Sequence, residues 1–324
     1  RRFLVHHQDA PSEAYNRFLA SADWLDDALL FMCLKAHHDD APWTDWPEAY
    51  RDRDPEAMAQ VRRDEKERLD IDAVIAFFFE HQWTEVRAAA ESRGISIFGD
   101  LPIYVAHDSA DVWAHRSLFE LTASGERVEV AAVPPDAFSA TGQLWGNPLY
   151  DWPVMAADNY AWWVRRIQRA LEWTPLLRLD HFRGFSEYYS VDGTATIATE
   201  GRWRPGPGLL LFNALDRALG VGPFIAEDLG LIGPKVHQLR DESGMLGMRV
   251  LQFGVAEPGQ NLHHPSSCPP DVVVYTGTHD NDTTAGWFAQ LEQDQRRRTV
   301  HTLGCSDTAH SVCEAMVESA FSSP

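Results

Sequence analysis

Four short apolar runs in this chain end directly in acidic residues, and helical patterns separate them. The runs cover residues 94–100, 176–180, 222–228 and 271–280, and their acidic ends are Asp100, Asp180, Glu227-Asp228 and Asp280. A fifth run, at 248–254, ends in glycine. Strands that alternate with helices predict a parallel sheet. Because an unpaired charge inside a core costs several kcal/mol or more, the acidic ends predict that the strands open into a polar cleft.

The acidic strand ends favour a (β/α)8 barrel over a doubly wound sheet. A doubly wound sheet usually carries a glycine-rich phosphate loop after one strand, and neither GxGxxG nor GxxxxGK follows any run here. In a barrel, catalytic residues come from the carboxyl ends of several strands. A closed barrel needs eight strands and the sequence supplies about five. We therefore expect the chain to be the middle of a longer protein, with further strands before residue 1 and after residue 324.

The pattern predicts a helical subdomain over residues 1–80 and a partial catalytic barrel over 81–324. Apolar stripes at helical spacing predict helices at 11–38, 55–69 and 72–93. Later helices are expected at 159–172, 210–219, 234–241 and 284–302. The segment 101–158 is predicted to be a long substrate loop, because loops of this length are usually functional.

Composition and net charge limit the classes of binding partner and the cellular compartment that we expect. The formal net charge is −20, which argues against nucleic acid and anionic membranes because both select basic patches. No apolar run reaches transmembrane length. The cysteines show no paired spacing and no Cys/His zinc pattern; they are Cys33, Cys268, Cys305 and Cys313. We expect four free thiols in a cytoplasmic protein. The net charge fits a neutral substrate, or none.

The charged residues of "LLRLD" and "IAED" suit acid–base chemistry on a sugar. Arg178 and Asp180 are two positions apart, so on a strand they share a face, and the guanidinium favours an ionised carboxylate. Glu227 follows two apolar residues, which suits a protonated acid. Retaining glycoside chemistry needs one carboxyl group of each kind. A purely structural Arg178–Asp180 ion pair remains open, and spacing cannot say whether Glu227 or Asp228 faces the cleft.

Two further patterns carry candidate sites. "HDND" could bind a metal through His279, Asp280 and Asp282, although a metal site would want more ligands at fixed spacing. In the 101–158 segment, Trp145 lies between glycines and next to Asn147. An exposed aromatic ring in that setting suits stacking on a sugar.

Several long motifs resemble one family. "GDLPIYVAHDSADVW", "FSATGQLWGNPLYDW", "LRLDHFRGF", "GRWRPGPGLLLFNAL", "FIAEDLGLI", "LQFG" and "VVYTGTHDND" occur in this order. They are similar to the amylomaltases, the 4-α-glucanotransferases of glycoside hydrolase family 77, which are related to the α-amylases. The resemblance runs from about Trp83 to Trp287.

The resemblance implies a retaining (β/α)8 transferase that moves α-1,4-glucan segments between maltooligosaccharides. It implies that Asp180 is the nucleophile, Glu227 the acid/base and Asp280 the transition-state stabiliser. The implied substrate-binding residues are Arg178, His279, Asp100, Asp136, Trp145 and Asn147. It implies no metal and no organic cofactor. The alternatives are an α-glucan hydrolase with the same carboxylates, a metal-dependent barrel hydrolase, and a non-catalytic glucan-binding protein.

Overall fold

The computed structural model describes residues 12–135, 139–220, 222, 224–230, 232–259 and 261–324. The chain divides into two compact units. The first unit holds residues 1–176 and 187–222, and the second holds residues 177–186 and 223–324. The chain therefore passes from one unit to the other three times. Among the described residues, no helix is both long and apolar enough to cross a membrane.

The first unit begins with helices and, within residues 12–97, the described chain forms no strand. The helices are α2 (Glu13–Ser21), α3 (Leu25–His37), η1 (Trp43–Asp45), α4 (Glu48–Arg51), α5 (Pro55–Asp64) and α6 (Lys66–Glu91). The single helix predicted over 11–38 is wrong in one respect, because the chain leaves helical geometry at Ala22. The predicted boundary between the helices at 55–69 and 72–93 also moves. Helix α5 begins at Pro55, after the N-cap residue Asp54, but ends at Asp64, and α6 starts at Lys66.

Aromatic packing explains the break between α2 and α3. Tyr15 and Phe18 of α2 lie against Phe77 of α6, with ring centroids 5.3 and 5.8 Å apart. Leu30 and Leu34 of α3 are almost completely buried elsewhere in the unit. A straight helix carries one apolar stripe, so the turn at Ala22 lets each half bury its own stripe.

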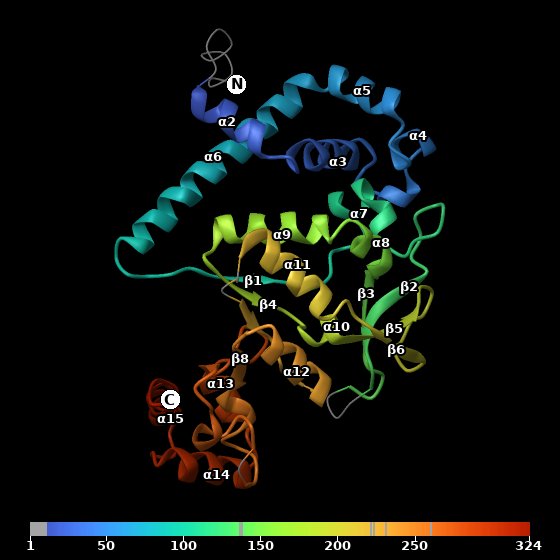
Figure 1. The fold of residues 1–324 in the computed structure, drawn as a ribbon. Helices are drawn as coiled ribbons and strands as arrows, with labels where there is room; N and C mark the ends of the chain where they lie inside the picture. The colour runs from blue at the N-terminus through green and yellow to red at the C-terminus, as the bar shows by residue number, and fades with distance from the viewer. Residues whose placement is uncertain (1–11, 136–138, 221, 223, 231, 260) are drawn as a thin grey trace. The chain divides into compact units, whose positions relative to one another are not determined.

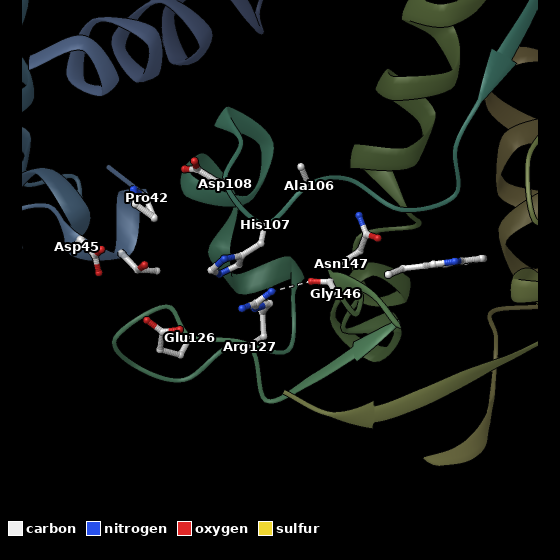
Figure 2. Close-up of a pocket in the computed structure, with 11 residues that line it drawn as sticks. Pro42, Asp45, Ala106, His107, Asp108, Glu126, Arg127, Gly146 and Asn147 are labelled. Atoms are coloured by element: carbon white, nitrogen blue, oxygen red, sulfur yellow. Dashed lines mark hydrogen bonds between the residues drawn. The ribbon is translucent and has the colours of Figure 1, made fainter. Parts of the chain in front are cut away.

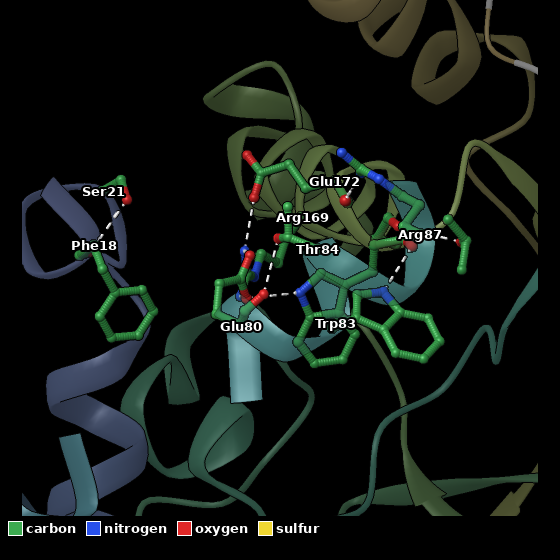
Figure 3. A network of polar contacts seen from close by, with 11 residues as sticks. Phe18, Ser21, Glu80, Trp83, Thr84, Arg87, Arg169 and Glu172 are labelled. Carbon is green, nitrogen blue, oxygen red and sulfur yellow. Dashed lines mark hydrogen bonds and ion pairs between the residues drawn. The ribbon is translucent and has the colours of Figure 1, made fainter. Parts of the chain in front are cut away.

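Helix α6 (Lys66–Glu91) is bound to α9 (Ala161–Trp173) by a polar network, which Figure 3 shows. Glu80 accepts hydrogen bonds from Arg169 at 2.5 Å and from the indole of Trp173 at 3.1 Å. Trp83 donates to the backbone carbonyl of Trp173 at 2.9 Å. Several such bonds on one side of a long helix fix its rotation about its own axis.

A four-stranded antiparallel sheet, with strand order β3-β2-β5-β6, completes much of the first unit. Its strands are β2 (Glu129–Val133), β3 (Gln143–Pro148), β5 (Glu187–Asp192) and β6 (Gly201–Pro205). The remaining elements are β1 (Phe98–Leu101), α7 (Ala110–Ala114), η2 (Arg116–Leu118), α8 (Trp152–Ala157) and α11 (Leu209–Leu219). The sequence predicted no strand beyond the five parallel ones, so this sheet corrects that count. The segment 101–158 is accordingly more than a loop, since its described part holds β2, β3, α7, η2 and α8.

The second unit contains parallel strand pairs, as the sequence predicted. The unit's elements are β4 (Leu176–Leu179), α10 (Arg183–Ser186), β7 (Phe224–Ala226), α12 (Pro234–Glu242), β8 (Gly247–Val250), η3 (Leu251–Phe253), η4 (Pro265–Ser267), β9 (Val272–Tyr275), α13 (Thr284–Gln290), α14 (Gln293–Leu303) and α15 (Ala309–Phe321). Strand β4 pairs in parallel with β7, and β8 pairs in parallel with β9; Figure 1 labels one strand of each pair, β4 and β8. A parallel bridge from Ile225 to Leu246 joins the two pairs. All four strands thus end at the same edge.

The C-terminal helix predicted over 284–302 is in fact two helices. The chain is extended at Leu291 and Glu292, and Glu292 forms a reciprocal capping box with Gln295. Such a box satisfies two backbone N–H groups at a helix start, which explains why a new helix begins there.

A buried ion cluster ties β7, β8 and α12 together. The side chain of Asp228 is completely inaccessible to solvent. It accepts hydrogen bonds from Arg240 at 2.7 Å, from the backbone N–H of Met248 at 2.7 Å, and from Arg249 at 3.5 Å. Gly247 lies directly beside the cluster, where an added Cβ would come within 2.7 Å of both Arg240 and Asp228.

We expect Gly247→Ala to lower the free energy of unfolding by about 1–3 kcal/mol, because the new methyl group must displace a packed, buried ion pair. The matched control is Gly233→Ala. Gly233 is the N-cap residue of α12, with φ −96° and an open Cβ position, so its change should cost no more than about 1 kcal/mol, from the N-cap preference for glycine over alanine. Urea unfolding of the intact protein measures both. Equal effects of the two substitutions would contradict the structural role of the cluster.

Candidate functional site

The carboxyl end of β4 carries a buried cation beside a partly exposed carboxylate. Arg178 is 6% exposed, and its Nη2 atom lies 2.8 Å from Oδ1 of Asp180. The contact between these two residues, which their spacing predicted, is therefore confirmed. The Asp180 side chain is 38% exposed, so a reactant can reach it while the arginine holds its orientation.

Glu227, at the end of the neighbouring strand β7, is held in its neutral form near pH 7. Burial and, to a smaller extent, the nearby charge of Asp180 together raise the pKa of Glu227 to about 8. Hydrogen bonds from the backbone N–H groups of Leu229 and His181, together with Arg178, oppose this rise. The Leu229 bond measures 2.9 Å. Two neighbouring carboxyl groups in such different environments suit different roles in acid–base chemistry.

The structure decides which member of the Glu227-Asp228 pair is structural. Asp228 is enclosed by Arg240, Arg249 and the backbone of Met248. Glu227 points to the other side of the chain, where Asp180 influences its pKa. This resolves the alternative that strand periodicity left open.

His181 is a member of this site that sequence reasoning did not select. Its φ of 49° is left-handed, a region that non-glycine residues seldom adopt. Burial, with a further contribution from Arg183, lowers the pKa of His181 to about 3, so its ring is neutral. The turn at His181 brings a backbone N–H to Glu227. The only sequence signal was the position directly after Asp180.

Asp280 and His279 lie in the loop that follows β9. Their side chains are about two-thirds exposed, and Nε2 of His279 lies 3.6 Å from Oδ1 of Asp280. Asn281 shapes this loop by accepting hydrogen bonds from the backbone and the hydroxyl of Thr278, both at 2.9 Å. Because the strands are parallel, this loop leaves the sheet at the same edge as Asp180 and Glu227.

The alternative metal ligand Asp282 is engaged otherwise. Its carboxylate accepts hydrogen bonds from the N–H of Thr283 at 2.7 Å and from Gln290 at 2.8 Å. Within the described part of the chain, His279, Asp280 and Asp282 do not gather into a group that could hold an ion. The geometry thus gives the metal-dependent alternative no support.

Three predicted substrate-binding residues belong to the first unit. Asp100 lies in β1 and is exposed, whereas Trp145 and Asn147 lie in β3. The fourth, Asp136, lies outside the described residues. Asn147 donates to the carbonyl of Val105 at 2.9 Å. Trp145 is 37% exposed, and its indole N–H donates to the side-chain oxygen of Gln143 at 3.1 Å.

Trp145 and Asn147 line one pocket, which Figure 2 shows in close-up. Its volume is about 500 Å³. Arg127 reaches across part of it and donates to the carbonyl of Gly146 at 3.0 Å. His107 also lines it, and burial lowers the pKa of His107. The sequence did not single out Arg127 or His107 as pocket residues.

Comparisons with known proteins agree on one family. The family described as 4-alpha-glucanotransferase, glycoside hydrolase family 77, matches residues 1–324. The chain is 44% identical to a chloroplastic/amyloplastic 4-alpha-glucanotransferase of Solanum tuberosum, over 96% of this chain and 54% of that protein. It is 46% identical to a 4-alpha-glucanotransferase of Synechocystis sp., over 88% of this chain and 57% of that protein.

A solved structure shows the same fold. The amylomaltase from Streptococcus agalactiae, solved in complex with acarbose, superposes with a TM-score of 0.91 at 34% sequence identity. The match covers 95% of this chain and 63% of that one. The chain thus spans about half the length of the curated relatives it matches. The family match extends over residues 1–324, and the structural match shows the same α/β fold. The chain belongs to the 4-alpha-glucanotransferase family, glycoside hydrolase family 77.

Proposed function

We propose that the protein is a 4-α-glucanotransferase that moves α-1,4-glucan segments between maltooligosaccharides with retention of configuration. The observation that carries the proposal is the pairing of Asp180, fixed by Arg178, with a Glu227 whose pKa is about 8. Retaining enzymes need one carboxylate as nucleophile and one carboxylic acid as proton donor. Membership of the 4-alpha-glucanotransferase family supports the choice of substrate.

In the first step of the proposed mechanism, an oxygen of Asp180 attacks the anomeric carbon of the donor glucan. The bond from that carbon to the leaving oxygen breaks, and Glu227 gives its proton to this oxygen. A covalent glycosyl–Asp180 ester results. Asp280 would stabilise the positive charge that develops on the sugar ring in the transition state.

In the second step, the 4-hydroxyl group of an acceptor glucan attacks the same carbon. Glu227, now a carboxylate, takes the hydroxyl proton, and Asp180 leaves as a carboxylate. The ester removes the negative charge of Asp180, one of the two influences that raise the pKa of Glu227. The same glutamate therefore holds its proton more tightly before the ester forms and is more easily kept ionised after it.

The proposal assigns substrate binding to Arg178, His279, Asp100, Asp136, Trp145 and Asn147. Trp145, with part of its ring exposed in a pocket rich in hydrogen-bonding groups, suits stacking on a glucose ring while polar neighbours bind hydroxyl groups. Excluding water around an acceptor would favour transfer over hydrolysis.

We also propose a barrel architecture, a helical subdomain and a cellular location for the protein. The four parallel strands of the second unit would form part of the wall of an α-amylase-type (β/α)8 barrel, and residues 1–80 would form a helical subdomain. The chemistry proposed here needs no metal or organic cofactor. The described cysteines are all free, as the sequence predicted, which supports a cytoplasmic location.

Replacing either central carboxyl group tests the assignment. In the intact protein, Glu227→Gln should reduce turnover by roughly 10²–10⁴-fold, because general acid–base catalysis contributes that much. Asp180→Asn should reduce it at least as far, since no covalent ester can form. The control, Glu314→Gln, alters a side chain of α15 that is 69% exposed and should retain normal turnover. Near-normal activity of either central variant would disprove its role.

The pH dependence provides an independent test. The reactive form of Glu227 is protonated, so kcat/KM should fall as the pH rises through about 8.

The pKa of Glu227 is raised on folding, so the folded protein binds this proton more tightly than the unfolded chain does. Stability from this group should be complete below about pH 4.5 and be lost as the pH rises toward 8. Urea unfolding between these pH values should show a shallower decline for Glu227→Gln than for the wild type; identical declines would contradict the shift.

Product analysis separates transfer from hydrolysis. Incubation of the intact protein with maltotriose should give free glucose together with longer oligosaccharides, while the number of reducing ends stays nearly constant. Chromatography and a reducing-end assay follow the two quantities. A steady rise in reducing ends without longer products would identify an α-glucan hydrolase instead.

A further inference from the structure

A second cluster of chemically reactive side chains lies in the first unit, among the N-terminal helices. Cys33 and His37 are four residues apart on α3, so they lie on the same face of that helix. Glu65 lies at the junction where α5 ends and α6 begins. One ligand atom from each of these three residues lies within 4.8 Å of the other two. Nε2 of His37 and Oε1 of Glu65 are 3.1 Å apart.

The burial of the three residues changes steadily from the core to the surface. Cys33 is completely buried, whereas the side chains of Glu65 and His37 are 27% and 42% exposed. An ion could therefore enter from solvent between the histidine and the glutamate and reach the sulfur behind them. In a tetrahedral site with bonds of about 2.0–2.3 Å, ligand atoms lie less than about 4 Å apart. The cluster needs only small side-chain movements to reach that spacing.

The surrounding charges favour a divalent cation. Arg68, Glu65 and Asp72 are the charged groups that act on Cys33. Arg68 also lies 3.8 Å from Asp72, so these two charges balance each other. A bound thiolate and Glu65 would then leave two negative charges for the ion to neutralise.

We propose that Cys33, His37 and Glu65 form a zinc-binding site that fastens α3 to the α5–α6 junction. One sulfur, one imidazole nitrogen and one carboxylate oxygen are ligands that Zn²⁺ accepts together, with water in the fourth position. The site is separate from the proposed catalytic residues Asp180, Glu227 and Asp280, which belong to the second unit. Its role is to hold helices together, because it joins segments from both sides of the α3–α5 connection.

Metal binding to the intact protein tests this site. The protein is first dialysed against a chelator, and Zn²⁺ or Co²⁺ alone is then added. We expect one Zn²⁺ per chain by elemental analysis and a higher melting temperature with Zn²⁺. Co²⁺ should give the near-ultraviolet absorption band of a cobalt–thiolate bond. No binding, or cobalt binding without this band, would overturn the proposal.

Single variants identify the ligands. Cys33→Ser should abolish the thiolate band. His37→Gln and Glu65→Gln, at partly exposed positions that tolerate substitution, should each weaken binding by more than the roughly 10–100-fold that loss of an outer-sphere partner costs. If Cys33→Ser does not fold, these two variants decide the question. Unchanged affinity in both would overturn the site.

The chain offers matched controls on α15. His310 and Glu314 form another histidine–glutamate pair at helical spacing, with 3.4 Å between Nε2 and Oε1, and Cys313 lies beside them in sequence. The ligand atoms of these three do not gather as those of Cys33, His37 and Glu65 do. Cys313→Ser and His310→Gln should leave zinc affinity unchanged. Loss of binding in these variants would assign the metal to α15 and overturn the proposal.

Discussion

The second unit depends on the hydrogen bonds and ion pairs that the buried carboxylate of Asp228 forms. It accepts hydrogen bonds from Arg240 of α12 and from the Met248 backbone of β8, while its own residue follows β7. Removing one partner of a buried ion pair leaves an uncompensated charge, which is costly. One side chain therefore determines how three elements meet, at the edge of the sheet where the reactive groups lie.

Glu227 depends on this anchor because it is the preceding residue. With Asp228 held on one side, the Glu227 carboxyl group is directed to the other, toward the backbone N–H groups of His181 and Leu229 and the charge of Asp180. A group whose pKa depends on burial must be kept at a fixed depth, and a rigid neighbour does this better than a mobile one. The dipeptide Glu227-Asp228 thus carries a carboxyl group with a raised pKa and a carboxylate that holds the fold together. The position of each residue limits the position of the other.

The parallel strands and the Arg178–Asp180 contact were predictable because both depend on short sequence periods. The five apolar runs became β1, β4, β7, β8 and β9, and a spacing of two placed Arg178 and Asp180 on one face. The antiparallel sheet was missed because strands such as β3, "QLWGNP", alternate poorly and depend on partners distant in sequence. Spacing left open for the same reason whether Glu227 or Asp228 faces the cleft: Arg240 and Arg249 enclose Asp228, and no local pattern points to them.

The course of the chain through the two units has a consequence for synthesis on the ribosome. Residues 177–186 belong with the segment that begins at 223, whereas 187–222 return to the first unit. Neither unit is a continuous stretch, so no single truncation separates them. The emerging chain must also hold β4 without its neighbour β7 until some forty-five further residues have been made. The second unit therefore cannot form its core before the segment that begins at residue 223 has been made.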